Sequence, residues 1–271
     1  MMIGASSFAG DLRELDDHVQ SVELYMPKLG VYEGSKLQKD RLEMVLDELS
    51  TCDLQTSMHA HYFADVPTYP KGLVVDTASM EKTHFSLMEE CIELAGRLGT
   101  KAVVLHPGRV GDDRKRSFDR MISNLRQLAE FASENNVMLG LENKEATDPG
   151  NLCCEAEELL KAVDAVGSQN LGVTFDVGHA NLTCGGDPEK LADFVSAISE
   201  HVVHVHLHDN YGFWTSNYDG DEHMAPGSGT IDYSVLKGLK RYDGIYNMEV
   251  FSLDDVLAGK KVIGKYVSSQ I

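Results

Sequence analysis

The chain has 271 residues, 42% of them hydrophobic and 25% charged, which is ordinary for a globular protein and excludes a disordered chain. One domain spanning residues 1–271 is expected, because α/β domains of about 250 residues are common. The 43 acidic residues against 24 Lys and Arg give a formal net charge of −19. This charge either reflects a solvated acidic surface or works against nucleic acid binding, because it repels polyanions.

Short apolar runs alternate along the chain with longer stretches of helical period, a pattern typical of βα units repeated around a parallel sheet. The predicted strands are Ile3–Ser7, Ser21–Tyr25, Gln55–Ala60, Ala102–His106, Val137–Glu142, Gly172–Asp176, Val202–His208 and Tyr246–Phe251. The predicted helices are Met80–Leu98, Phe118–Asn135, Glu155–Val166, Pro188–Ser199 and Tyr233–Lys240. Eight strands in this alternation predict the α/β class and a single (β/α)8 barrel.

Local signals support these boundaries. Asp187 before Pro188 is typical of a helix start, and Gly99 and Gly167 stand where helices end. Two irregular stretches, residues 62–78 and 209–231, each follow a strand, so they are predicted to be rim loops.

The five cysteines are odd in number and form no CxxC pair, so neither a disulfide framework nor a thiolate zinc site is expected. Charged residues take the place of an apolar secretion signal near the N-terminus, and no later apolar run is long enough to span a bilayer. A cytoplasmic protein with no membrane partner is therefore expected. The sequence carries no signal for an oligomeric state.

Metal-binding side chains stand at the ends of six predicted strands. They are His59, His106, Glu142, Asp176 with His179, His206 with His208, and Glu249. The carboxyl ends of barrel strands converge on one rim. A single residue of this kind is commonly a polar group at the solvent boundary, but six strands together indicate a metal site. Imidazoles mixed with carboxylates suit zinc, manganese or iron, and we expect zinc or manganese.

The loop after the seventh predicted strand adds further candidates. Asp221 and His223 lie on the same side of an extended segment and can hold one ion together. The following Gly227, Ser228 and Gly229 either form an ordinary turn or offer backbone N–H groups to a substrate phosphate.

His204, His206 and His208 alternate along one strand, so all three side chains share a face. Only one of them need bind metal. We interpret His204 as a packed interior residue and His208 as a possible substrate contact.

At these residues the sequence resembles the superfamily that joins type-IV apurinic endonucleases to xylose-isomerase-like sugar isomerases and epimerases. The motifs are HAHY, HPG, LEN, FDVGH, HLHD, DEHMAPGSG and MEVF, which span nearly the whole chain. The resemblance implies that each chain binds one to three metal ions. The nine ligands that it implies are His59 rather than His61, His106, Glu142, Asp176, His179, His206, Asp221, His223 and Glu249.

For a sugar isomerase or epimerase, the resemblance implies one ion held by Glu142, Asp176, His206 and Glu249. Glu142 and Glu249 would then be the catalytic acid and base that move a proton beside the substrate carbonyl through an enediolate. The loop sequence around DEHMAPGSGTIDY looks more like this branch, so a sugar or sugar phosphate is the expected partner.

The alternative is zinc-dependent phosphodiester hydrolysis at abasic DNA, which the nine matching residues favour. The basic residues nearest the rim are Arg109, Arg114, Lys115 and Arg116. They stand among Asp112 and Asp113, which is typical of a solvated helix start rather than a phosphate-binding track. Tyr62 and Phe63 either wall a sugar pocket or wedge into a base stack. A third class, a noncatalytic barrel that binds a ligand or protein, is opposed by the number of acid/base candidates.

Overall fold

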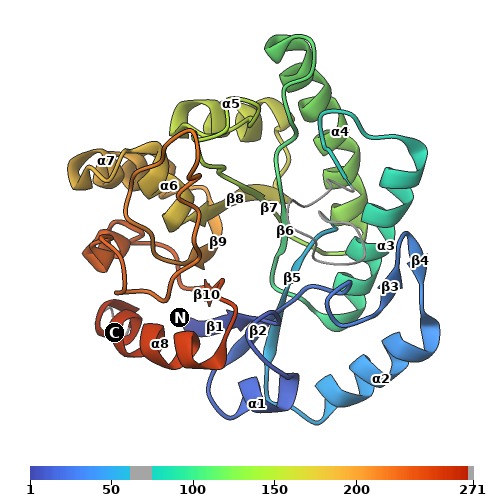
Figure 1. Cartoon of the computed structure of the whole chain (residues 1–271). Coiled ribbons are helices and arrows are strands. Elements are labelled where there is room, and N and C mark those ends of the chain that lie inside the picture. The colour runs from blue at the N-terminus through green and yellow to red at the C-terminus, as the bar shows by residue number, and fades with distance from the viewer. Residues whose placement is uncertain (62–74, 268–271) are drawn as a thin grey trace.

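The centre of the molecule is a closed barrel of eight parallel strands, hydrogen-bonded in the order β1–β10–β9–β8–β7–β6–β5–β2. The structure is a computed structural model that describes residues 1–61 and 75–267. The barrel strands are β1 (Met2–Ser6), β2 (Ser21–Leu24), β5 (Gln55–His59), β6 (Val103–Leu105), β7 (Leu139–Glu142), β8 (Leu171–Asp176), β9 (Val202–Leu207) and β10 (Ile245–Met248). Figure 1 shows the strands at the centre and the helices around the outside. The predicted single (β/α)8 barrel is confirmed.

All eight predicted strands are present, although several end earlier than predicted. The sixth barrel strand of the prediction, Gly172–Asp176, is extended at its start to Leu171, whereas β6 stops at Leu105, β9 at Leu207 and β10 at Met248. His106, His208 and Glu249 therefore lie just after the strands, where the chain turns out of the barrel. A short hairpin of β3 (Tyr32–Glu33) and β4 (Lys36–Leu37) stands apart from the barrel sheet.

The helices that cover the barrel are α1 (Leu12–Asp16), α2 (Lys39–Ser50), α3 (Lys82–Leu98), α4 (Arg114–Glu134), α5 (Ala156–Val166), α6 (Val177–Thr183), α7 (Pro188–Ile198) and α8 (Leu253–Val267), with a 3-10 helix, η1 (Tyr233–Gly238). The predicted α-helix Tyr233–Lys240 is wrong in type, since this segment forms the tighter η1. Helix α4 begins four residues before the predicted Phe118, because its first turn is charged and is capped by Asp113, which accepts a hydrogen bond from the Arg116 amide.

Helices α1, α2, α6 and α8 are absent from the prediction. In α6 the side chains from Val177 to Leu182 are all buried, so the segment has no polar face and no helical period to read. In α2 only Leu42 and Val45 are buried, which is too few to mark a face. The buried residues of α8 do follow a helical period, so that helix was readable from the sequence.

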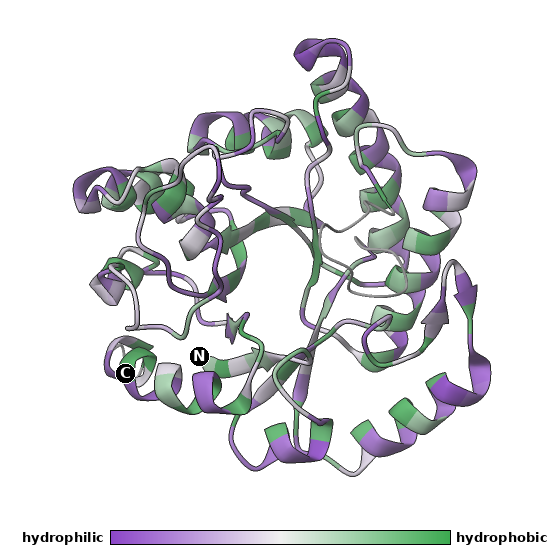
Figure 2. Ribbon diagram, in the orientation of Figure 1, coloured by the Kyte–Doolittle hydropathy of each residue, from purple (hydrophilic) through white to green (hydrophobic). Residues whose placement is uncertain are grey.

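The core lies between the barrel and the helix layer. In Figure 2 the apolar parts of the outer helices turn toward the strands, and the hydrophilic parts turn outward. Helix α3 is an example, with Leu87, Met88, Cys91, Ile92 and Leu94 buried against the core. Burial of this layer holds the strand ends in fixed positions around one mouth. Within the described residues, no helix is long and apolar enough to cross a membrane.

The predicted helix caps are present. Gly99 and Gly167 adopt the left-handed conformation, with φ of 64° and 69°, at the C-terminal ends of α3 and α5. Asp187 caps the start of α7, and its carboxylate accepts hydrogen bonds from the Glu189 and Lys190 amides at 3.0 and 3.3 Å.

We expect Asp187→Ala to lower the free energy of unfolding by about 1 kcal/mol, because two amides of the first helical turn lose their acceptor. Urea unfolding of the full chain measures this change. Asp193→Ala, an exposed position in the same helix, is the control, with an expected change within about 0.5 kcal/mol. Equal stability of the Asp187 and Asp193 variants would contradict the capping role.

Candidate metal centre

The carboxyl ends of the strands bring all nine predicted ligands to one mouth of the barrel. Strands β5, β7, β8 and β9 carry His59, Glu142, Asp176 and His206 at or near their ends, and His106 and Glu249 follow β6 and β10 directly. The other three ligands come from helix α6, which carries His179, and from the loop at residues 209–231, which carries Asp221 and His223. Four clusters of side chains at this mouth could each hold a metal ion, and three of them are built mainly from the predicted ligands; the fourth is Glu23, His204 and His206.

The first group is centred on Glu142. Its Oε2 lies 3.2 Å from His106 Nε2 and 3.8 Å from His59 Nε2, and the two imidazole nitrogens are 3.1 Å apart. The same oxygen also lies 3.7 Å from His206 Nδ1, which is the centre of the next group. Glu142 is therefore placed to bridge neighbouring cation positions.

The second group is centred on His206. Its Nδ1 lies 3.1 Å from Glu249 Oε2 and 3.7 Å from both Glu142 Oε2 and Asp176 Oδ2. Three carboxylates thus face one imidazole nitrogen at the bottom of the mouth. This is the four-residue set that the sequence resemblance assigns to a single ion in epimerases.

The third group contains His179, Asp221 and His223, and it includes one residue that was not predicted as a ligand, His208. Asp221 Oδ2 lies 3.6 Å from His179 Nε2 and 3.4 Å from His223 Nε2. The predicted pairing of Asp221 with His223 therefore agrees with the geometry of the loop.

Several of the imidazoles are oriented by backbone carbonyl groups. The Nδ1 atoms of His59, His179 and His223 lie 2.9, 3.0 and 2.8 Å from the carbonyl oxygens of Ala60, Asn143 and Glu249, respectively. A carbonyl oxygen only accepts, so each Nδ1 carries the proton. With Nδ1 used in this way, Nε2 is the nitrogen left to bind a cation between the ring and the carboxylates, which is the arrangement of metal-binding histidines.

The charges of the site balance only when protons or cations are added. Burial raises the pKa of Glu249, but the neighbouring His206 outweighs this and holds that pKa well below its usual range. Burial lowers the pKa of His223, but Asp221 and Glu249 raise it overall to about 9. The neighbouring carboxylates therefore retain a proton on His223, and a divalent cation can replace that proton.

The residues present fit a metal ion. Asp176 Oδ2 and Asp221 Oδ1 are buried and accept no hydrogen bond within residues 1–61 and 75–267. A buried carboxylate oxygen without a donor is costly, and a bound cation removes that cost. Mixed imidazole and carboxylate ligands are the set that zinc or manganese accepts.

Sequence reasoning missed Glu23, which lies beneath the metal groups. It comes from β2, is 1% exposed, and its Oε2 lies 2.8 Å from His204 Nε2 and 3.0 Å from His206 Nε2. The interpretation of His204 as a packed interior residue agrees with this contact. A signal was available, because Glu23 stands between Val22 and Leu24 in a buried strand, and the alternation of side chains along a strand turns it to the opposite face from them.

The metal groups open into a cavity of about 350 Å³. One side of this cavity is cationic and another is aromatic, and the sequence analysis predicted neither. Lys144 Nζ lies 3.6 Å from Glu142 Oε1 and 3.3 Å from Glu145 Oε2. The aromatic side is formed by Phe8, Tyr25 and Phe251: Phe8 stacks on Tyr25 at 5.1 Å between ring centroids and contacts Phe251 edge-on at 5.8 Å. Such a pocket suits a small polar molecule with one apolar face.

The residues predicted to contact substrate lie in different places. Tyr62, like Phe63, falls outside the described residues. His208 is fully buried and does not line the cavity. The Gly227 amide donates to Asp209 Oδ2 at 2.9 Å, and the Ser228 amide donates to the Ala225 carbonyl. These two amides are used inside the protein, which disfavours a phosphate site there. A Cβ on Gly229 would stand 2.3 Å from Asp209 Oδ1, so the chain is closely packed at that position too.

The basic residues of the segment that follows β6 are paired with acids. Arg109 contacts Asp148 at 2.6 Å, Arg114 contacts Glu158 at 2.7 Å, and Lys115 contacts Asp119 at 2.5 Å. The interpretation of these residues as part of a solvated helix start agrees with the pairing of Lys115 within α4. They form no continuous cationic track at the mouth.

The chain is similar in sequence to several known proteins. Residues 13–265 match the family described as the xylose isomerase-like TIM barrel. An uncharacterized protein of Methanocaldococcus jannaschii is 34% identical over 204 residues, covering 71% of this chain and 67% of that protein. A probable endonuclease 4 of Mesomycoplasma hyopneumoniae is 29% identical over 192 residues, covering 65% of this chain and 66% of that protein.

Solved structures extend the likeness over the full chain. A D-tagatose 3-epimerase-like protein superposes with a TM-score of 0.79 at 26% identity, covering 100% of this chain and 98% of the other. The IOLI protein with a binding zinc atom superposes with a TM-score of 0.74 at 19% identity, covering 100% and 99%. The likeness to IOLI is one of fold. The named relatives thus include both an epimerase-like protein and an endonuclease.

Proposed function

We propose that this chain, which belongs to the xylose isomerase-like TIM barrel family, is a divalent-metal-dependent sugar or sugar-phosphate epimerase or isomerase. The observation that carries the proposal is the contact of His206 Nδ1 with Glu249, Asp176 and Glu142 at 3.1 to 3.7 Å. The sequence resemblance assigns these four residues to the single ion of an epimerase.

The two catalytic residues of the proposal are Glu142 and Glu249. They come from β7 and from the end of β10, which are separated in the barrel by β8 and β9, so the carboxylates approach the cavity from different directions. Burial raises both pKa values, but neighbouring His106 and His206 outweigh it and keep both groups ionised. One carboxylate can therefore accept the proton from the carbon beside the substrate carbonyl to give an enediolate. The other carboxylate takes a proton from water and passes it to that carbon.

A bound ion would be zinc or manganese, with one to three ions per chain. Its contribution when bound is to polarise the substrate carbonyl and the adjacent hydroxyl. The protein holds the reacting carbon between Glu142 and Glu249. The ring stack of Phe8 on Tyr25 covers one side of the cavity and limits the access of water to it.

A second candidate function is phosphodiester hydrolysis at abasic DNA. It is favoured by the convergence of all nine ligands and by the 29% identity to a probable endonuclease 4. It is opposed by the net charge of −19 and by the pairing of Arg109 and Arg114 with acids, because DNA affinity depends on cations that neutralise phosphates. We therefore place it second.

We expect the metal-loaded protein to interconvert ketoses, aldoses or their phosphates and to exchange the hydrogen on the carbon beside the carbonyl. The test incubates the full chain, loaded with manganese or zinc, with a panel of sugars and sugar phosphates in deuterated water. Proton NMR then reads deuterium at that carbon. An abasic-site DNA duplex at moderate salt is assayed in parallel.

Deuterium incorporation that requires the metal supports the proposal. Nicking of the duplex with no exchange in any sugar would overturn it in favour of hydrolysis. Neither reaction, with metal bound in full, would count against both.

A further inference from the structure

The imidazole of His206 lies between carboxylates at both of its ring nitrogens. Nδ1 faces Glu249 Oε2 at 3.1 Å, in the second ligand group, and Nε2 lies 3.0 Å from Glu23 Oε2. Glu23 comes from β2, which β1 and β10 separate from β9 in the barrel, so its contact with His206 crosses the barrel interior. Both side chains are buried, so bulk water does not compete for this contact.

We propose that Glu23 is a positioning residue for the ion of the second group: it holds the His206 ring so that Nδ1 binds the cation, and its negative charge strengthens that bond. A carboxylate that accepts a hydrogen bond from the second nitrogen of a metal-binding histidine fixes the ring and makes the ligand more basic. The resemblance assigns no role to Glu23. The inference rests on the proposed function in placing an ion at His206, and it adds a residue on which the affinity for that ion depends.

The contact with Glu23 determines which nitrogen of His206 carries the proton. A carboxylate oxygen only accepts, so the ring donates to it from Nε2, and the lone pair stands on Nδ1. His204 donates from Nε2 to the same oxygen at 2.8 Å, and Ser57 Oγ donates to it at 3.5 Å. The rings of His204 and His206 are nearly perpendicular, with 83° between their planes. Donors from β5 and β9 therefore fix the carboxylate, and the carboxylate in turn fixes the His206 ring.

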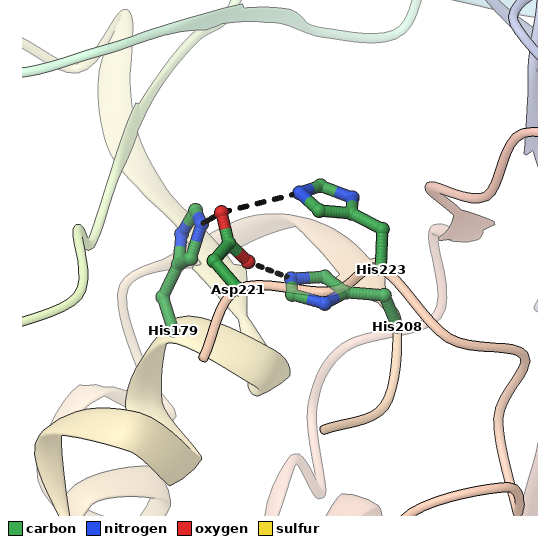
Figure 3. A group of neighbouring side chains, drawn as sticks. All are labelled: His179, His208, Asp221 and His223. Carbon is green, nitrogen blue, oxygen red and sulfur yellow. Dashed lines mark ion pairs between the residues drawn. The ribbon is translucent and has the colours of Figure 1, made fainter. Parts of the chain in front are cut away.

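The third group is held in a different way. Figure 3 shows this group with its polar atoms turned toward one space, and its members are His179, His208, Asp221 and His223. His223 faces Asp221 through Nε2, and its Nδ1 lies 2.8 Å from the backbone carbonyl oxygen of Glu249. A backbone carbonyl carries no net charge, whereas Glu23 places a full negative charge behind His206. A substitution of Glu23 is therefore expected to weaken the second group and to leave the third unchanged.

A cation between Glu23, His204 and His206 is the competing interpretation, since each of these side chains offers one ligand atom. The distances oppose it. With zinc–ligand bonds of about 2.0–2.1 Å, ligand atoms in a tetrahedron stand about 3.3–3.4 Å apart. Glu23 Oε2 lies only 2.8 and 3.0 Å from the two ring nitrogens. These are the lengths of hydrogen bonds, so protons rather than an ion lie between the carboxylate and the rings.

The test compares Glu23→Met with His204→Gln in the full chain. Methionine keeps the length of the side chain but is a weak hydrogen-bond acceptor, so the His206 ring loses the group that fixes it. His204→Gln removes the neighbouring ring from the same carboxylate and leaves the contact of Glu23 with His206 in place. Both positions are buried, so both substitutions disturb the barrel interior, but only the first is expected to weaken ion binding at His206.

Zinc affinity is measured by competition with a chelator, and urea unfolding of the metal-free proteins reports their stability separately. We expect Glu23→Met to lower the affinity for the ion at His206 by about 10- to 100-fold. His204→Gln is expected to keep an affinity close to that of the wild type. Glu23→Gln retains an accepting oxygen without the charge, so it should lose less affinity than Glu23→Met, and it takes the place of that variant if Glu23→Met folds poorly.

Nitrogen-15 NMR of the zinc-loaded, histidine-labelled protein identifies the ring that loses its ion. The signals of His206 and His223 are assigned from His206→Gln and His223→Gln, in which each disappears. In the wild type we expect zinc at Nδ1 of His206 and an Nε2 proton that Glu23 protects from exchange with water. In Glu23→Met both features should weaken at a zinc concentration that still saturates His223.

Wild-type affinity in the Glu23 variants would overturn the inference and leave Glu23 with a structural role alone. A loss in His204→Gln as large as that in Glu23→Met would also overturn it, in favour of an ion between the two rings or of a general disturbance of the interior. A wild-type protein without zinc at His206 would count against the ion of the proposed function and would remove the inference with it. No measurement uses a substrate, so these failures are distinguishable.

Discussion

Glu142→Gln is expected to lower kcat/KM of the metal-loaded protein on its sugar substrate by at least about 1,000-fold, which corresponds to about 4 kcal/mol of transition-state stabilisation. Glutamine keeps the shape of the side chain, but it holds no charge and accepts no proton. The loss is large because Glu142 acts in two ways. It is a proposed proton carrier, and its Oε2 lies 3.2 Å from His106 and 3.7 Å from His206, so it joins two ligand groups.

The measurement pairs initial rates with metal content on the same sample, because a lost ion alone would also lower the rate. We expect excess manganese to restore part of the metal content of Glu142→Gln without restoring turnover. Glu157→Gln is the matched control, since Glu157 is an exposed glutamate at the start of α5, away from the cavity. Turnover of the Glu142 variant within about tenfold of the wild type, with metal bound, would remove Glu142 from the proposed mechanism.

The metal-free Glu23→Gln protein is expected to be less stable than the metal-free wild type by about 3 kcal/mol near neutral pH. Burial raises the pKa of Glu23, but the charge of His206 and hydrogen bonds from His204 and His206 lower it overall, from 4.5 to about 2. The folded chain thus binds the Glu23 proton more weakly than the unfolded chain. This stabilisation is present above about pH 4.5 and is lost as the pH falls toward about 2.

Urea unfolding in the presence of a chelator, repeated from neutral to acidic pH, measures the difference between the two proteins. We expect the difference to shrink as the pH falls below about 4.5. Glu157→Gln, at an exposed position, provides the comparison, with an expected change in stability within about 0.5 kcal/mol at neutral pH. A gap between Glu23→Gln and the wild type that stays constant with pH would mean that the charge of Glu23 does not stabilise the fold.

The sequence predicted the barrel because strand-forming runs and helical periods alternate along it, and both signals are local. It also predicted which strand ends carry metal-binding side chains, since all such ends meet on one rim of a barrel. Helix α6 escaped prediction for the opposite reason: its side chains from Val177 to Leu182 are all buried, so burial on every side erases the period that marks a surface helix.

Contacts between distant segments account for what the sequence did not show in the site. Glu23 meets His204 and His206 across the barrel interior, and Lys144 meets His179 of α6 where β7 turns out of the barrel. The aromatic side of the cavity joins Phe8 to Phe251, from opposite ends of the chain. No local pattern encodes these meetings, because each depends on how strands are ordered around the barrel.

The Asp209 carboxylate, noted above as the acceptor of the Gly227 amide, has a wider consequence for how this protein can change over evolution. It also accepts a hydrogen bond from the Ile231 amide, and the Asp209 backbone is hydrogen-bonded to Met224. These bonds join the two ends of the 209–231 loop at its base. The outer part of the loop carries the exposed rings of Phe213 and Trp214. Insertions or substitutions in that outer part can change which ligands enter the cavity, while the side chains at the strand ends keep their positions.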